Sequence, residues 1–434
     1  MLLAKYFKSL YSINMRKNYY VFIVIFGALL ISNSIIAHTR TRVKKALFVI
    51  VDGIARDMLK SSSTPCLDSI SAYGAFADAY VGGEKGSYSQ SPTISAVGYN
   101  SLLTGTWAEK HNVWDNDIAA PNYNYPTVFR LFKNQYPNKK IAVFSSWQDN
   151  RTKLIGEGKP ETGNIKMDYA CDGYELDTVN FPQDSKRIFM RNIDEKVVSE
   201  AAKCVRADAP DLSWVYLEFT DDMGHMYGDS RQMKDAIHFE DTLMGRLWDA
   251  IKYREKNFNE EWLLVITTDH GRSPLDGKGH GGQSDRERGT WIVTNYKDVN
   301  ASFKRTTPGI VSILPSITNY LGVDVPKNTK YELDGVPFVG SVYFSDFKSE
   351  EKDGKFYFSW NDLSNNKNQT ADILVSYTNN VKVGGTDKYQ KIATVKLSEN
   401  KLELNKNLNK SDFYKFVLET PDQTMNYWIV GDNK

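Results

Sequence analysis

Six side chains of types that bind metal ions, and one hydroxyl, occur in short clusters along the chain. They are Asp52, Ser95, Asp221, His225, Asp269, His270 and His280. Imidazole nitrogens and carboxylate oxygens are the ligands that zinc-type ions take in catalytic sites. The 434-residue chain has six histidines, and three of them fall in these clusters. The pattern predicts a site for divalent metal ions, with Ser95 as its hydroxyl and Thr93 as the alternative.

Several of these clusters directly follow short apolar runs that predict buried parallel strands. The runs are residues 46–51, 141–144, 214–219 and 263–267. Between them lie helical patterns with apolar residues at three- and four-residue spacing, for example at residues 235–253. Alternating strands and helices indicate an α/β fold, a mostly parallel sheet with helices on both faces. In such sheets ligands bind at the carboxyl ends of the strands, where most of the candidate metal ligands are expected.

The pattern changes after a polar, charged segment at residues 345–354. Short strands are predicted beyond it, at residues 355–360, 371–378, 391–396, 413–419 and 425–430. We therefore expect a catalytic domain at residues 44–345 and a small β-sandwich of fibronectin or immunoglobulin type at residues 354–434. The candidate ligands all precede this second domain.

The N-terminus has the pattern of a targeting segment. A basic start at Met15-Arg-Lys precedes an apolar run at residues 21–30 and a small residue, Ala37. This order predicts a signal peptide at residues 1–37 and a periplasmic or secreted protein, with an uncleaved membrane anchor as the alternative. In an oxidising compartment two cysteines could pair, and Cys171 with Cys204 is the better combination.

The composition of the chain limits the kinds of partner that we expect. The net charge is +1, so no nucleic-acid-binding footprint is present. Hydrophobic residues make up 41% of the chain, which is enough for a substantial core. We expect a small molecule as the partner, while the sequence leaves the oligomeric state open.

Eight short motifs follow one another along the chain: FVIVDG, STPCLDSI, SPTISAVGYNSLLTGTWAEKHNVWDN, TDDMGH, TTDHG, GHGG, PSITNYLG and ELDGVPF. Taken together, these motifs resemble the alkaline phosphatase superfamily, in particular its nucleotide pyrophosphatase/phosphodiesterase-like branch, over residues 44–342. The resemblance implies an alkaline-phosphatase-like sheet. It also implies two divalent metal ions, with zinc as the expected ion.

The resemblance also implies a role for each candidate residue. One ion would be held by Asp52, Asp269 and His270, and the other by Asp221, His225 and His280. Ser95 would lie between the ions as the nucleophile, at the start of a helix that ends at Leu103-Thr104-Gly105. The expected activity is phosphoester hydrolysis that favours phosphodiesters or nucleotide pyrophosphates, with an alkaline-phosphatase-like phosphomonoesterase as the alternative.

The nucleophile region departs from the family pattern. Many phosphodiesterase relatives have a threonine nucleophile and an asparagine three residues later, where this chain has Ser95 and Gly98. Asn100 is the candidate to replace the asparagine amide. The alkaline phosphatases also have a third metal site, but Tyr216 stands where its glutamate is expected, and Glu218 is the nearby alternative.

Other residues have candidate roles, and two other function classes are disfavoured. Arg151 and Arg272 are candidates to bind the substrate phosphate, and Trp107, Trp114 and Trp147 are candidates to pack against a flat substituent. His111 is expected to be structural and His238 to be a packing or surface residue. A sulfatase is disfavoured, since Val97 and Tyr99 follow Ser95 where its maturation motif has proline and arginine. A non-catalytic binding protein would not need six metal-ligand-type residues.

Overall fold

The computed structural model describes residues 41–404 and 408–431. The predicted targeting segment at residues 1–37 lies outside these ranges. Among the described helices, none is long and apolar enough to cross a membrane.

A seven-stranded sheet forms the centre of the described chain, in the order β2-β7-β6-β1-β5-β3-β4. Its strands are β1 (Val43–Val51), β2 (Ala75–Tyr80), β3 (Ile141–Ser145), β4 (Tyr169–Cys171), β5 (Leu212–Leu217), β6 (Glu260–Thr267) and β7 (Gly289–Thr294). The pairs β1–β5, β5–β3 and β3–β4 are parallel. Strand β7 is antiparallel to both β2 and β6. The predicted α/β class is confirmed, with β7 as the exception within a mostly parallel sheet.

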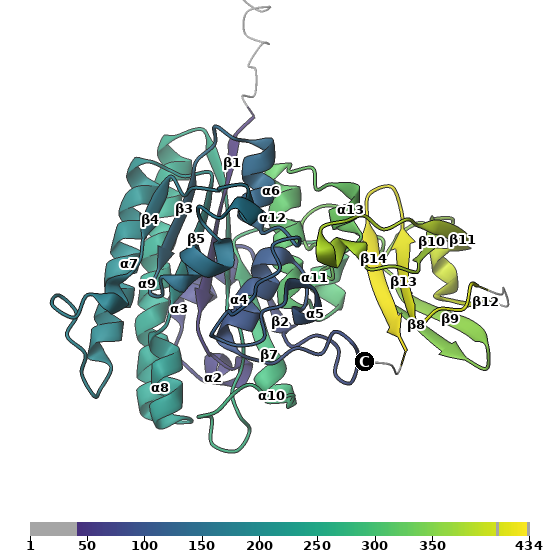
Figure 1. Ribbon diagram of the computed structural model, residues 1–434. Coiled ribbons are helices and arrows are strands. Elements are labelled where there is room, and N and C mark those ends of the chain that lie inside the picture. Colours follow the sequence, from purple (N-terminus) through teal and green to yellow (C-terminus); the bar gives the residue numbers. More distant parts are fainter. Residues whose placement is uncertain (1–40, 405–407, 432–434) are drawn as a thin grey trace, which may run out of the picture. The chain divides into compact units, whose positions relative to one another are not determined.

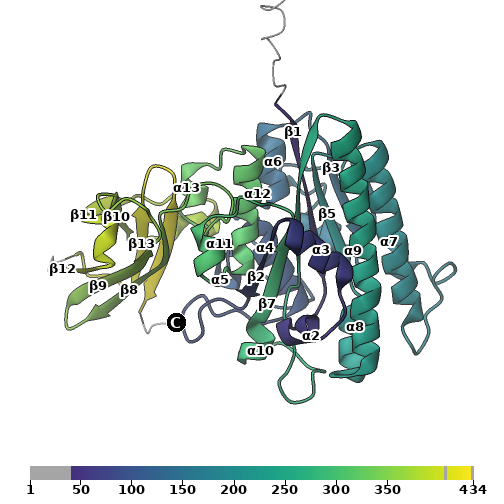
Figure 2. The ribbon, with the colours of Figure 1, turned by 180° about the vertical axis from the view of Figure 1, so that it is seen from behind.

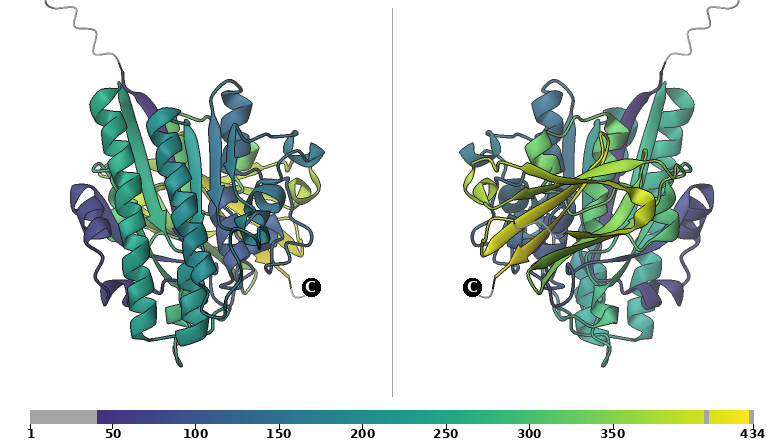
Figure 3. Two further views of the ribbon diagram at one scale, coloured as in Figure 1. Left: turned by 90° about the vertical axis from the view of Figure 1, so that its left-hand side faces the viewer. Right: turned by 90° about the vertical axis from the view of Figure 1, so that its right-hand side faces the viewer.

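Helices cover both faces of this sheet (Figures 1 and 2). The α-helices are α2 (Arg56–Lys60), α3 (Pro65–Tyr73), α4 (Ser95–Thr104), α5 (Ala108–His111), α6 (Val128–Gln135), α7 (Ile188–Ala207), α8 (Phe219–Tyr227), α9 (Arg231–Asn257), α10 (Asp285–Arg288), α11 (Ala301–Arg305), α12 (Ile313–Leu321) and α13 (Lys327–Lys330). The long helices α7 and α9 pack side by side on one face (Figure 3, left). Helices α4, α6 and α12 pack on the other face.

Strand β1 shows why the sheet is covered on both faces. Successive side chains of a strand point to opposite faces. Phe48 and Ile50 belong to the core beneath α4 and α6, whereas Leu47 and Val49 belong to the core beneath α7 and α9. The apolar run at residues 46–51 is therefore continuous because both faces of β1 are buried.

The C-terminal region contains two small antiparallel sheets, with the orders β12-β9-β8 and β11-β10-β13-β14 in the described part of the chain. Their strands are β8 (Phe344–Lys352), β9 (Lys355–Asp362), β10 (Thr370–Ser376), β11 (Gln390–Lys396), β12 (Lys401–Leu404), β13 (Phe413–Glu419) and β14 (Thr424–Val430). One hydrophobic core contains residues of both sheets, including Phe347, Phe358, Ile373 and Phe416. Two antiparallel sheets that share one core are the arrangement of a small β-sandwich.

The charged segment at residues 345–354 is not a simple connecting loop. Most of it belongs to β8, which pairs with β9 through a two-residue turn. The charges were misleading because alternate residues of β8 face solvent while Phe347 and Ser349 face inward. The three cysteines, all within the described chain, are free, so the expected pairing of Cys171 with Cys204 is not present.

Buried polar contacts connect the sandwich to the region of α5. The ammonium group of Lys110 donates to Asn426 Oδ1 at 2.9 Å, to the backbone oxygen of Glu332 at 2.9 Å, and to Asp334. Lys415 of β13 donates to Glu332 Oε1 at 2.6 Å. The rings of Tyr88 and Trp428 stack with centroids 5.2 Å apart. The two sheets are thus joined to the rest of the fold by buried charged groups, which need their partners.

Candidate metal centre

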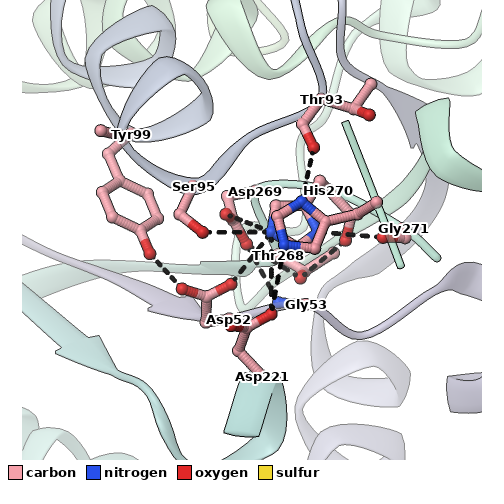
Figure 4. Close-up of polar contacts among 12 residues, drawn as sticks. Asp52, Gly53, Thr93, Ser95, Tyr99, Asp221, Thr268, Asp269, His270 and Gly271 are labelled. Carbon is pink, nitrogen blue, oxygen red and sulfur yellow. Dashed lines mark hydrogen bonds and ion pairs between the residues drawn. The ribbon is translucent and has the colours of Figure 1, made fainter. Parts of the chain in front are cut away.

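The three carboxylates among the predicted ligands, and His270, lie just after strands of the central sheet. Asp52 follows β1 directly, and Asp269 follows β6 after one residue, Thr268, while Asp221 lies in the first turn of α8 after β5. Figure 4 shows Asp52, Asp221, Asp269 and His270 converging on one point below Ser95. The carboxyl ends of the strands therefore bring together residues that are more than 200 positions apart in the sequence.

Asp52, Asp269 and His270 form a first group of potential ligands. One ligand atom from each lies within 4.8 Å of the others. His270 Nε2 lies 3.3 Å from Asp52 Oδ1 and 3.3 Å from Asp269 Oδ2. Within the described chain, these two buried carboxylate oxygens have no hydrogen-bond donor. Buried carboxylate oxygens without donors are costly, and a cation between them would remove that cost.

The orientation of His270 points to the same conclusion. Its Nδ1 lies 2.9 Å from the backbone oxygen of Gly271, an acceptor, so the proton of the neutral ring is on Nδ1. Nε2 then directs a lone pair toward Asp52 and Asp269. A lone pair facing two carboxylate oxygens is repulsive unless a positive ion lies among them, and this is the arrangement of a metal-ligating histidine with its second nitrogen fixed by a backbone carbonyl.

Burial shifts the protonation of this group. Burial, together with the charges of Asp269 and Asp221, raises the pKa of Asp52 well above its usual range. Burial is also the main reason that the pKa of Asp269 rises to about 7. Burial and the neighbouring His280 lower the pKa of His270 well below its usual value. These shifts describe a site in which carboxylates and a neutral imidazole are crowded together, and a bound cation would stabilise the ionised carboxylates.

Asp221, His225 and His280 form the second group. His280 Nε2 lies 3.1 Å from His225 Nε2 and 3.9 Å from Asp221 Oδ1. His225 Nε2 lies 3.3 Å from Asp221 Oδ2. His280 Nδ1 lies 3.0 Å from the backbone oxygen of Thr93, which again leaves the Nε2 lone pair facing the cluster. The structure thus brings all six predicted ligands to one place, as two groups that share the space around His270.

Arg272 is part of this second group, although not as a phosphate-binding residue. It is fully buried, and it donates to Asp221 Oδ1 at 2.6 Å and to the backbone oxygen of Gly53 at 2.8 Å. Burial alone would raise the pKa of Asp221, but Arg272 and His225 hold it well below the usual range. The expectation that Arg272 binds substrate is therefore wrong. Arg151 is also committed elsewhere, since it donates to Asp172 and Glu157.

Ser95 is the first residue of α4, as predicted, and its Oγ lies 3.2 Å from His270 Nε2 (Figure 4). Thr93, its alternative, is used in a different way. The Thr93 hydroxyl donates to the backbone oxygen of Gly282 at 2.9 Å and accepts from the backbone N–H of Gly281 at 2.9 Å. Thr93 thus fixes the loop that carries His280, while the hydroxyl that faces the cluster of candidate ligands is that of Ser95.

Asn116 is a residue that the sequence analysis missed. Its Oδ1 accepts a hydrogen bond of 3.0 Å from the backbone N–H of Ala96, at the first turn of α4. It lines a cavity of about 370 Å³ together with Ser95, Trp147 and Arg187. It lies in the same segment as His111, shortly after α4, and the sequence analysis assigned only a structural role to that segment. Asn100, the residue considered instead, is buried within α4.

The residues that line this cavity include one of the three tryptophans expected to contact a flat substituent. Trp147 lines it, whereas Trp107 and Trp114 are not among its lining residues. Trp107 is buried against Tyr80. Trp114 is exposed, and its Nε1 donates to Asn112. Of the three tryptophans, Trp147 is therefore the one that shares the cavity with Ser95.

Two tyrosine hydroxyls bond to the second carboxylate oxygen of Asp52, Oδ2. Both hydroxyls donate to Asp52 Oδ2, that of Tyr216 at 2.8 Å, and the two hydroxyl oxygens lie 2.8 Å apart. Burial, and next the charge of Asp52, raise the pKa of both tyrosines well above the usual range, so both hydroxyls stay protonated. Glu218, considered for a third metal site, contacts Arg187 at 3.4 Å instead. Asp52 Oδ2 is thus already satisfied without a third ion.

The two remaining histidines of interest have the expected roles. His111 is buried, with Nε2 3.0 Å from Ser101 Oγ, and its Nδ1 accepts from the backbone N–H of Val113 at 3.1 Å. It therefore joins α4 to the segment that carries Asn116. His238 lies at the surface of α9 with Nδ1 3.1 Å from the backbone oxygen of Ser63.

Comparison with known proteins gives the family. The family model for type I phosphodiesterase / nucleotide pyrophosphatase matches residues 46–391. The chain belongs to this family. An ectonucleotide pyrophosphatase/phosphodiesterase of Caenorhabditis elegans is 24% identical over 228 residues, which cover 52% of this chain and 28% of the relative. Family member 1 of the human ectonucleotide pyrophosphatases/phosphodiesterases is 22% identical, covering 42% of this chain and 19% of the relative.

The chain thus spans less than a third of the length of each of these relatives. Among solved structures, human ectonucleotide pyrophosphatase/phosphodiesterase 5 superposes with a TM-score of 0.47 at 16% identity, covering 65% of this chain and 96% of that one. Membership of the phosphodiesterase family fits the donor set described above, because oxygen and nitrogen ligands around a buried hydroxyl suit metal-assisted phosphoester hydrolysis.

Proposed function

We propose that this phosphodiesterase-family protein is a two-metal phosphoester hydrolase in which Ser95 is the nucleophile. The observation that carries the proposal is the pair of donor-free oxygens, Asp52 Oδ1 and Asp269 Oδ2, which both face His270 Nε2 at 3.3 Å. Asp52, Asp269 and His270 would hold one ion. Asp221, His225 and His280 would hold the other. Zinc is the ion that these nitrogen and oxygen donors suit best.

Zinc ions, when bound, supply positive charge that lowers the pKa of the serine hydroxyl and stabilises the departing oxygen. Ser95 Oγ gives its proton to water and forms a bond to phosphorus while the bond to the leaving group breaks, and the leaving oxygen takes a proton from water. A water molecule then cleaves the phosphoserine ester and returns the free hydroxyl. The first N–H groups of α4 favour the phosphate at this position, because a helix N-terminus carries partial positive charge.

Asn116 is proposed to orient the substrate. Its Oδ1 is held by the backbone N–H of Ala96, so its amide nitrogen is the group left to donate into the cavity beside Ser95. This placement supplies the amide that the family pattern suggested at the position of Gly98. Trp147, on the same cavity, would pack against a flat or apolar substituent.

Phosphodiesters or nucleotide pyrophosphates are the proposed substrates, and phosphomonoesters are the alternative. Tyr99 and Tyr216 support the first choice, because their hydroxyls use the Asp52 oxygen that a third cation would require. A monoester dianion benefits more from additional cationic charge than a diester monoanion does. The N-terminal pattern of residues 15–37 supports a further proposal, that the protein works outside the cytoplasm as a periplasmic or secreted enzyme.

The test uses a zinc-saturated sample with bis-p-nitrophenyl phosphate and p-nitrophenyl phosphate. We expect a higher kcat/KM for the diester, loss of turnover on chelation, and recovery when zinc is added. Ser95→Ala should lower kcat by several orders of magnitude while zinc still binds. Thr93→Ser, which keeps the hydroxyl contacts to the His280 loop, is the matched control and should retain most of the activity. Full turnover in chelator, or an active Ser95→Ala, would refute the proposal.

A further inference from the structure

Helix α8, which carries Asp221 and His225, begins without a cap from its own residues. The first N–H groups of a helix need acceptors, and these usually come from a Ser, Thr, Asp or Asn at the N-cap position. Here Glu218 occupies that position and its side chain makes no capping bond. The acceptor comes from another helix. Asp194 of α7 accepts from the backbone N–H of Phe219 at 2.7 Å and from that of Glu218 at 3.1 Å.

Two further side chains meet the Asp194 carboxylate. The hydroxyl of Ser146, directly after β3, donates to its Oδ1. The carboxyl group of Glu240, on α9, faces it, and neither Glu240 oxygen has a hydrogen-bond partner among the described residues. Asp194, Ser146 and Glu240 are at most 1% exposed. A carboxylate offers about four acceptor sites, and the two backbone N–H groups, the serine hydroxyl and a protonated Glu240 would fill them.

The partners of the two carboxyl groups decide where the proton is. Asp194 has three donors besides Glu240, whereas the Glu240 oxygens have no donor among the described residues. Two buried carboxylates in contact do not both ionise, so the proton belongs on Glu240. Burial, and next the charge of Asp194, raise the pKa of Glu240 well above its usual range. The other charged groups that face Glu240 are Arg191, which lowers its pKa, and Glu195, which raises it.

We infer that ionised Asp194 and protonated Glu240 form a buried pair that positions α8, and thereby the metal ligands Asp221 and His225. The inference rests on the metal site proposed above. The negative charge of Asp194 stabilises the N-terminus of α8 in a site that water does not reach. Because Asp221 lies in the first turn of α8, a shift of that turn moves its carboxylate relative to His280. Partners that hold metal ligands in this indirect way change metal affinity by about 10–100-fold when they are mutated.

The experiment measures zinc affinity by competition with a chromogenic chelator, independently of turnover. Asp194→Asn should weaken zinc binding about 10–100-fold, because the amide has no charge and one fewer acceptor. Glu240→Gln should bind zinc within about threefold of the parent protein, because a neutral amide N–H can replace the carboxyl proton as the donor. Glu240→Ala removes that donor and should fall between the two. Glu195→Gln, which changes the exposed neighbour of Asp194, is the matched control and should equal the parent protein.

A pH series separates this positioning role from a general packing role. As pH rises through the pKa of Glu240, its ionisation places a second negative charge beside Asp194, so the parent protein should lose zinc affinity relative to Glu240→Gln. Equal zinc affinity for Asp194→Asn and the parent protein would overturn the inference. Equal losses of zinc affinity in Glu240→Gln and Glu240→Ala would also overturn the inference. This comparison can be made even when Asp194→Asn does not fold. A parent protein that binds no zinc would instead refute the proposed metal site.

Discussion

Gly98 allows a demanding test of the active-site geometry, because α4 packs directly against a candidate metal ligand there. A Cβ atom at this position would lie 2.7 Å from the backbone oxygen of Asp269 and 2.9 Å from its Cβ. Non-bonded carbon contacts are normally about 3.5–4.0 Å. Gly98→Ala would therefore push α4, with Ser95 at its start, away from Asp269 by roughly half an ångström. An asparagine at this position would meet the same close contact.

Two opposing effects determine how much Gly98→Ala changes the stability of the protein. Alanine in a helix interior is favoured over glycine by about 1 kcal/mol. Overpacking a buried contact costs about 1–3 kcal/mol, so a net loss of up to about 2 kcal/mol of stability is expected. A misplacement of about 1 Å at reacting groups can cost about 100-fold in rate, so half that shift predicts a loss of roughly tenfold in kcat.

The assay is the kcat of zinc-saturated Gly98→Ala on bis-p-nitrophenyl phosphate, with urea unfolding of the same sample. The control is Gly279→Ala, next to His280, where the nearest atom to the new Cβ is 3.7 Å away. That substitution should leave kcat unchanged. If Gly98→Ala kept full activity and gained about 1 kcal/mol of stability from helix propensity, the close contact between α4 and Asp269 would be refuted.

Two further predictions concern stability. Removal of residues 344–434 should lower the melting temperature and promote aggregation, because the buried ammonium group of Lys110 loses its contact with Asn426. In the same melting assay, Asn426→Ala in the full chain should lower the melting temperature by a smaller amount. Burial lowers the pKa of His111 to about 3, against about 6.5 when unfolded, so the unfolded state binds the extra proton between these values. Stability should therefore be complete above pH 6.5 and fall by about 3 kcal/mol toward pH 4. This loss of stability at acid pH should be smaller in His111→Gln and unchanged in His238→Gln, as measured by urea unfolding.

The sequence predicted those features that depend on short stretches of chain. The apolar run at residues 46–51 identified β1 because both faces of that strand are buried. The ligands after β1 and β6 could be identified because a parallel sheet collects residues at one edge. Residues 214–219 were extended too far, since β5 ends at Leu217 and Phe219 already begins α8. That boundary is set by Asp194, which is distant in the sequence and gives no local signal.

The residues that were missed share a dependence on distant partners. Asn116 can be recognised as a site residue once the backbone N–H of Ala96 is seen to hold its amide. Arg272 appeared free to bind phosphate, but its charge is used by Asp221, 51 positions away. A sequence shows which side chains could bind a substrate or an ion. It does not show which of them are already paired within the fold, and that pairing decided each of these cases.

The two oxygens of Asp52 connect this pairing to the proposed substrate preference. Oδ1 faces His270 and has no donor among the described residues, whereas Oδ2 accepts from Tyr99 and Tyr216. Two divalent ions among three ligand carboxylates leave one excess positive charge, and Arg272 adds little because it is paired with Asp221. A phosphodiester monoanion balances that charge, while a monoester dianion exceeds it. The tyrosine hydroxyls therefore provide a physical basis for the proposed preference for diesters. They bond to the Asp52 oxygen that a third cation would need.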